Sequence, residues 1–108
     1  MLEVVVYETE EGRAPFDEWF NALDTQAALK VTTAIARIET GNLGDVKPVG
    51  QGVSERRIPF GPGYRLYFGQ DGEKLVVLLT GGTKKRQSKD IDQAHAFWAD
   101  YKKRKKGG

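Results

Sequence analysis

The most constraining feature of this sequence is an uninterrupted apolar run, Leu75–Leu79, which follows an Asp71-Gly72 turn. Such a run is typical of a central strand that is covered on both faces of its sheet. The Asp-Gly pair predicts a tight hairpin with the preceding strand. Because a chain of 108 residues buries only roughly two-thirds of its unfolded surface, we expect one small core in a single domain over residues 1–108.

Other strands are expected on the N-terminal side of this run. Ser54–Phe60 and Tyr64–Phe68 are joined by a turn at residues 61–63, and the Leu75–Leu79 strand follows them. Three consecutive strands with short connections form an antiparallel meander. Residues 2–7 alternate in polarity and predict a short strand that can join the same sheet.

Helical periodicity covers the remaining apolar residues. Pro15 to Leu23 carries one apolar stripe, and the spacing from Ala28 to Ile38 predicts a second helix that ends near Gly41. Their short link predicts a helical hairpin. The glycine-rich stretch 41–52 predicts a loop, and a last helix is expected from about Ser88. The basic tail, residues 102–108, is expected to be flexible.

These elements predict an α+β fold in two layers. Their order is β-α-α-β-β-β-α, with an antiparallel meander sheet and a helical hairpin packed on one face. No apolar run is long enough for a transmembrane helix, and the N-terminus does not match a signal peptide. We therefore expect no membrane association.

Charge is distributed unevenly along the chain. Residues 1–55 hold four basic and ten acidic groups, whereas residues 56–108 hold thirteen basic and five acidic groups. A basic C-terminal half suggests a face for a polyanion such as nucleic acid. The alternative is that these charges are ordinary solvated surface.

Several cations are expected to converge at the sheet. Arg57 and Arg65 lie on neighbouring meander strands, and Lys84, Lys85 and Arg86 follow the central strand. Convergent guanidinium and ammonium groups can bind phosphate. The structural alternative for Arg65 is an ion pair with Glu55 or Glu73, and the basic run could be a solvated loop.

Other chemistries are less compatible with the composition. The chain has no cysteine, which excludes disulfides and thiol catalysis and fits a reducing cytoplasm. A single histidine, His95, makes a multi-histidine metal site or a Ser-His-Asp triad improbable. Gly81-Gly82 could offer backbone N–H groups to an anion, but the spacing of a Walker A loop is missing.

Three sequence segments together resemble a known family. SERRIPFGPGYRLYF (residues 54–68), GGTKKRQSKDI (residues 81–91) and the PFxxWFxxL pattern (residues 15–23) resemble the RelE/HigB superfamily of bacterial toxins. Within it, they resemble the phage Gp49-like branch of addiction module killer proteins. The resemblance extends from Val4 to about Trp98 and implies a RelE-like fold.

The resemblance implies a cytoplasmic type II toxin that cleaves mRNA, often on the ribosome, without a metal or other cofactor. In such enzymes the RNA 2′-hydroxyl attacks the adjacent phosphate, and cations stabilise the charge that develops there. It also implies a cognate antitoxin, with a helix-turn-helix domain, encoded beside the toxin gene. A basic groove would be neutralised by an acidic or amphipathic segment of that partner.

The resemblance assigns roles to individual residues. Arg65 would stabilise the phosphate, Arg57 and Lys84 would assist it, and Glu55 would be a candidate proton acceptor. The residues expected to bind the RNA are Lys85, Arg86, Gln87 and Lys89. Two alternatives remain open: a ParE-like toxin that binds DNA gyrase, and a phage interaction module without catalytic activity.

Overall fold

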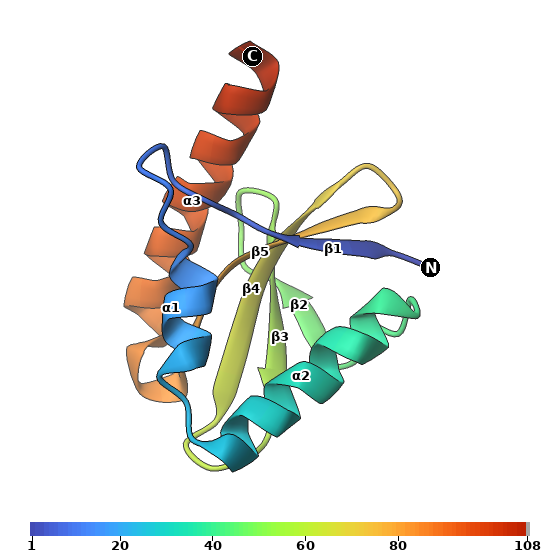
Figure 1. Cartoon of the computed structure of the whole chain (residues 1–108), viewed down its shortest axis with the longest axis vertical. Coiled ribbons are helices and arrows are strands. Elements are labelled where there is room, and N and C mark those ends of the chain that lie inside the picture. Colours follow the sequence, from blue (N-terminus) through green and yellow to red (C-terminus); the bar gives the residue numbers. More distant parts are fainter. Residues whose placement is uncertain (108) are drawn as a thin grey trace.

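One mixed β-sheet organises the molecule, and the computed structural model describes residues 1–107 (Figure 1). In chain order the elements are β1 (Glu3–Val6), α1 (Pro15–Asn21), α2 (Thr25–Glu39), β2 (Val46–Pro48), β3 (Val53–Ile58), β4 (Tyr64–Asp71), β5 (Leu75–Thr83), the 3₁₀ turn η1 (Lys84–Arg86) and α3 (Gln87–Gly107). The strand order is β1-β5-β4-β3-β2. The predicted α+β class is confirmed.

The central meander follows the sequence prediction. β3 pairs antiparallel with β4, and β4 pairs antiparallel with β5. Every residue from Val76 to Leu79 is at most 2% exposed, as expected for a strand that is covered on both faces. β4 and β5 change register between Tyr67 and Phe68, where a bulge leaves Leu79 without a direct partner.

Two features make the sheet larger than predicted. β1 joins it as expected, but it pairs parallel to β5, so the sheet is mixed. Residues 41–52 were predicted to be a loop, yet Val46–Pro48 forms the edge strand β2 against β3. This strand has only three residues and contains a proline, which is tolerated at a sheet edge. A strand of three residues is too short to show the alternation of apolar and polar residues by which strands are predicted.

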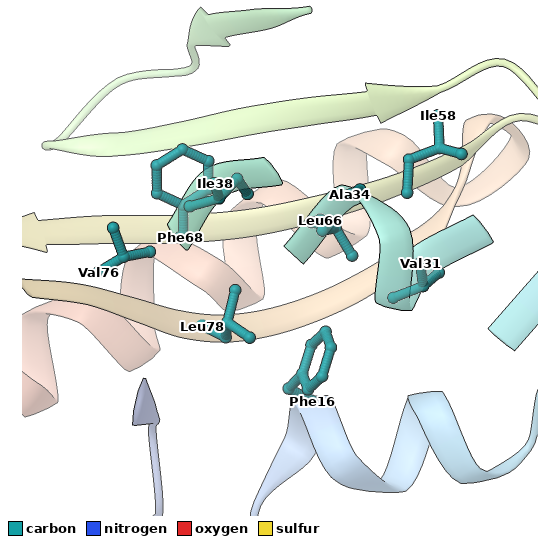
Figure 2. Close-up of a cluster of buried hydrophobic side chains, with 9 residues drawn as sticks. All are labelled: Phe16, Val31, Ala34, Ile38, Ile58, Leu66, Phe68, Val76 and Leu78. Atoms are coloured by element: carbon teal, nitrogen blue, oxygen red, sulfur yellow. The ribbon is translucent and has the colours of Figure 1, made fainter. Parts of the chain in front are cut away.

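The first face of the sheet is covered by α1 and α2. Phe16 of α1 and three residues of α2 (Val31, Ala34 and Ile38) meet side chains from β3, β4 and β5, as Figure 2 shows. In Figure 1 α1 and α2 diverge from their short link, so the predicted helical hairpin is splayed open on the sheet. Both helices contribute apolar side chains to the cluster on this face.

The second face is covered by α3, so the predicted two-layer arrangement is wrong. Trp98 and Ala94 of α3 pack on Tyr67, Val77 and Leu79. The Leu75–Leu79 run required a cover on both faces, but periodicity alone did not say which helix supplied the second one. The fold therefore has three layers, with the sheet in the middle.

α3 also continues into the basic tail that was expected to be flexible. It is helical through Gly107, and residue 108 lies outside the described residues. Arg104 pairs with Asp100 one turn earlier, and Lys105 pairs with Asp71 at the end of β4. Tyr101 also donates a hydrogen bond to Asp71. These contacts with the β4–β5 hairpin extend the helix beyond the point where sequence composition predicts fraying.

Gly81 and Gly82 lie within β5, paired with Leu66 and Arg65, so they do not form the predicted anion-binding loop. A Cβ at Gly81 would lie 2.2 Å from the Trp19 ring, and one at Gly82 would lie 1.9 Å from Asp90 Oδ2. Glycine is needed at both positions because a helix side chain lies directly against the strand backbone. Trp19 of α1 does so at Gly81 on one face of the sheet, and Asp90 of α3 does so at Gly82 on the other face.

Candidate functional site

The predicted cations lie where β3, β4 and β5 approach the start of α3. Arg57 and Arg65 are direct partners in the β3–β4 ladder, and Arg65 is opposite Gly82 of β5. Directly opposed residues project from the same face of a sheet, so both arginines lie on the α3 side. The backbone N–H of Lys84 donates to Gly63 O at 2.9 Å, which holds the start of η1 beside the start of β4. The structure therefore brings Arg57, Arg65 and Lys84 to the same end of the sheet.

Glu55 lies at the centre of a buried polar cluster on this face. Its side chain is fully buried, and it accepts hydrogen bonds from Arg65 Nη1 at 3.3 Å, Tyr67 Oη at 3.1 Å and Gln87 Nε2 at 2.9 Å. We call these four residues the Glu55 cluster. It connects β3, β4 and the first residue of α3, so it sets the position of α3 relative to the strands.

Arg65 is the member of this cluster predicted to bind phosphate. It is 7% exposed, and its ion pair with Glu55 is the structural alternative that the sequence left open. Its Nε is buried and has no hydrogen-bond partner within residues 1–107. The Glu55 carboxylate thus fixes the guanidinium while leaving part of its donor capacity unused.

Arg57 lies outside the buried cluster. Its Nη2 is 3.1 Å from Asp45 Oδ1, and both side chains are exposed. An exposed pair of this kind is held weakly, and typical values are about 0–1 kcal/mol. Arg57 can therefore exchange Asp45 for another anion at small cost.

The remaining predicted nucleic-acid-binding residues are on the surface. Lys84, Lys85 and Arg86 of η1 are exposed, as is Lys89 in the first turn of α3. No ion pair to these four side chains is present within residues 1–107. Gln87, in contrast, is half-buried in the Glu55 cluster. The exposed four form a basic edge beside Arg57 and Arg65.

Two further residues of this region were not assigned a role from the sequence. Tyr67 donates to Glu55, and burial, followed by the nearby Glu55 charge, raises the pKa of its hydroxyl. Tyr64 and Tyr67 are three residues apart on β4 and face opposite sides of the sheet: Tyr64 packs on the α1–α2 side and Tyr67 on the α3 side. The three-residue spacing on a strand was the signal that only one tyrosine could join the cations.

Asp90 is the second addition. It is 6% exposed, and its Oδ2 is buried without a hydrogen-bond partner within the described residues. Burial raises the pKa of this carboxyl, although the neighbouring Arg86 and Lys89 act in the opposite direction. It lies over Gly82, next to Arg65 in the sheet register. No sequence signal pointed to this contact, because Gly82 and Asp90 meet only when α3 packs on the sheet.

Two other polar side chains of α3, His95 and Tyr101, make structural contacts elsewhere. His95 Nε2 is 2.9 Å from Val49 O, and this contact holds the β2–β3 connection to α3. Tyr101 donates to Asp71, and burial together with this bond raises its pKa to about 12. Neither is part of the Glu55 cluster.

Residues 1–107 contain neither a metal-binding cluster nor a helix suited to span a membrane. These residues contain no group of three or more His, Cys, Asp or Glu side chains placed to bind one metal ion. Within the same range, no helix combines the length and hydropathy needed to cross a bilayer.

Comparison with known proteins shows where the chain belongs. No family model matches it. A protein of Haemophilus influenzae described as an uncharacterized protein is 45% identical over 80 residues, which are 73% of this chain and 81% of that protein. The chain belongs to the same family as this protein. Because the relative's description carries no activity, the site must be interpreted from its own geometry.

Proposed function

We propose that this protein is a RelE-like toxin of a type II toxin–antitoxin system, acting in the cytoplasm as a metal-independent mRNA endonuclease. The observation that carries the proposal is the convergence of Arg57, Arg65 and Lys84 at one end of the sheet. The resemblance of residues 54–68 and 81–91 to this superfamily supports it. The order of the strands and helices is compatible with a RelE-like fold once β2 is added as an edge strand.

In the proposed reaction the 2′-oxygen of a ribose attacks the adjacent phosphorus, and the bond from phosphorus to the 5′-oxygen breaks. The products are a 2′,3′-cyclic phosphate and a 5′-hydroxyl. Arg65 would stabilise the negative charge of the pentavalent phosphate, with Arg57 and Lys84 beside it. Lys85, Arg86 and Lys89 would contact neighbouring phosphates of the RNA.

Burial changes the role proposed for Glu55. A fully buried carboxylate with three donors has no surface to offer an RNA. In the proposal Glu55 is therefore a positioning residue, which holds Arg65 and Gln87, rather than the acceptor of the 2′-hydroxyl proton.

The first experiment is inducible expression in a bacterium, with growth and mRNA integrity as measurements. Arg65→Ala removes the phosphate ligand but also leaves Glu55 unpaired, so the double variant Arg57→Gln/Lys84→Gln, on exposed residues, is the sharper test. We expect the wild-type chain to arrest growth and cleave mRNA, and the double variant to lose at least about tenfold in cleavage. Lys102→Gln/Lys103→Gln removes the same charge from the far end of α3 and should keep activity.

A second candidate function is a non-catalytic interaction module. It is favoured by the ion pairs that occupy both arginines, Arg57 with Asp45 and Arg65 with Glu55. Expression without toxicity and with intact mRNA would support this module and contradict the endonuclease. DNA damage with continuing translation would instead indicate a ParE-like toxin that acts on gyrase.

Partner binding gives an independent measurement. The proposal includes a small helix-turn-helix antitoxin encoded next to this gene, and it includes the ribosome as the place of cleavage. Co-expression with the neighbouring gene should yield a stable complex and restore growth. Cleavage of a translated mRNA in the presence of ribosomes, compared with naked RNA, measures the ribosome dependence.

A further inference from the structure

A second group of cations lies on the opposite side of the sheet, between α2 and β3. It surrounds a cavity of about 240 Å³ whose walls include Lys30, Thr33, Arg37, Arg56, Ile58 and Phe60. We call this cavity the α2 pocket. Arg56 and Arg57 are successive strand residues and project from opposite faces, so the α2 pocket is separate from the Glu55 cluster.

Arg56 is the unusual residue of the α2 pocket. It is 7% exposed, and its Nε is buried without a hydrogen-bond partner within residues 1–107. Its Nη1 donates to the backbone oxygen of Arg57, and no carboxylate forms an ion pair with it. A buried guanidinium without a counter-charge is costly, because desolvation is not offset by attraction.

The neighbouring charges increase the free-energy cost of burying the Arg56 guanidinium. Burial lowers the pKa of Arg56, and repulsion from Arg37 lowers it further. Asp45 attracts Arg56 more weakly, and its carboxylate is already paired with Arg57. The α2 pocket thus holds an uncompensated concentration of positive charge.

Two features hold these cations in place. The Arg56 guanidinium lies against Gly44, where an added Cβ would be 2.6 Å from Cζ, so the connection before β2 leaves room for it. Lys30 Nζ lies over the Phe60 ring, 5.4 Å from its centroid, and this contact directs the ammonium toward the cavity wall. Arg56 and Lys30 are thus positioned before any ligand arrives, while Arg37 is an exposed cation in the wall of the same cavity.

A phosphate group matches this arrangement. Arginine presents a planar fork of donors that suits phosphate oxygens, and lysine adds a compact charge. The cavity is far larger than the roughly 10–15 Å³ needed for one water molecule, and its wall includes the apolar side chains Ile58 and Phe60. It therefore has room for a phosphate together with the organic group to which it is esterified.

We propose that the α2 pocket binds the phosphate group of a phosphate ester through Arg56, Arg37 and Lys30. The ester is either a mononucleotide or one phosphate of an RNA strand, which share this chemistry. The proposal does not depend on the endonuclease activity, because none of its residues belongs to the Glu55 cluster or the basic edge.

The test is an NMR titration of the isotope-labelled protein, followed at the Arg56 Nε–H and Gly44 N–H signals. The ligands are inorganic phosphate, uridine 5′-monophosphate and a short 2′-O-methyl RNA, which lacks the hydroxyl needed for cleavage. We expect a saturable shift of both signals with an ester. Saturation by the mononucleotide supports a small-molecule ligand, and saturation by the RNA alone supports a nucleic-acid phosphate.

Variants of exposed residues provide the matched controls. Lys30→Gln/Arg37→Gln should weaken binding at least about tenfold, because two of the three cations proposed to bind the phosphate are lost. Lys47→Gln/Lys74→Gln removes the same charge from exposed residues outside the α2 pocket and should leave the affinity unchanged. Lys84→Gln/Lys89→Gln, on two exposed residues of the basic edge, should also leave the Arg56 response unchanged, which separates this site from the proposed catalytic one.

Four results would overturn the proposal. The first is the absence of any shift at Arg56 with either ester. The second is an equal loss of binding in the Lys30/Arg37 and Lys47/Lys74 double variants, which would show unspecific attraction. The third is binding of inorganic phosphate without binding of either ester. The fourth is tighter binding of a dicarboxylate, glutarate, than of the esters.

Discussion

Arg65 and Arg56 lie on opposite faces of the same sheet, and each is 7% exposed, yet their electrostatic surroundings differ. Arg65 has the Glu55 carboxylate at 3.3 Å, while Arg56 has a backbone oxygen and a repelling Arg37. In both cases Nε is buried without a partner. The two arginines are therefore equally buried, but only Arg65 has an ion-pairing carboxylate.

The difference indicates what each arginine contributes. The charge of Arg65 is neutralised inside the protein, so it can stabilise the fold while part of the donor capacity of its fixed guanidinium stays unused. The charge of Arg56 is not neutralised by residues 1–107, so an external anion would stabilise it. Three predictions, given from the largest expected effect to the smallest, test this comparison.

The largest effect is expected when Glu55 loses its charge. Glu55→Gln keeps an acceptor for Tyr67 and Gln87 but leaves Arg65 without a counter-charge, which should lower the free energy of unfolding by about 3–5 kcal/mol. Urea denaturation at constant m-value measures the loss. Asp45→Asn, which breaks the exposed pair with Arg57, should cost less than about 1 kcal/mol.

The second arm of this prediction is a double variant. Adding Arg65→Met to Glu55→Gln removes the uncompensated charge and should restore at least about 1 kcal/mol of the lost stability. A double variant less stable than Glu55→Gln would show that Glu55 stabilises the fold through Tyr67 and Gln87 rather than through Arg65.

An intermediate effect, with a different outcome for the two arginines, is expected from replacing each by methionine. Arg56→Met removes a charge that has no counter-charge, so the free energy of unfolding should rise or change by less than about 1 kcal/mol. Arg65→Met leaves Glu55 unpaired and should cost about 3 kcal/mol. Similar losses from both, measured by thermal or urea unfolding, would contradict the comparison.

The smallest effect concerns Asp90, the buried carboxyl beside Arg65. Because burial raises its pKa in the folded protein, the folded state binds this proton more tightly than the unfolded state does. Its contribution to stability is therefore present at low pH and is lost as pH rises from the ordinary carboxyl range, about pH 4, through the raised folded value.

Asp90→Asn removes this titration. Relative to wild type, the variant should gain stability between about pH 4 and pH 7, measured by urea unfolding at each pH. Asp92→Asn, on an exposed residue of the same helix, should show no such trend. The stability difference between Asp90→Asn and wild type could instead stay constant or decrease as pH rises. Either result would contradict a raised pKa for the buried Asp90 carboxyl.

The site was predictable only in part. The strand assignments placed Arg57 and Arg65 on neighbouring strands, and the two-residue periodicity separated Tyr64 from Tyr67; both follow from backbone geometry. The pairing of Glu55 with Tyr67 and Gln87 was not predictable, since Gln87 is 32 residues away and begins a helix whose docking face was unknown. The two-residue periodicity put Arg56 on the opposite face from Arg57, but no sequence signal showed that Arg56 would be buried without an ion pair.

The sequence alone specified the meander, the three helices and the two-sided burial of Val76–Leu79, because periodicity and turn chemistry act over a few residues. Tertiary structure decided that α3 covers the second face, that Val46–Pro48 joins the sheet edge and that the basic tail continues as a helix. It also placed the Glu55 carboxylate within ion-pair distance of Arg65 and no carboxylate of residues 1–107 within that distance of Arg56. These outcomes depend on contacts between residues far apart in the chain, which local patterns do not encode.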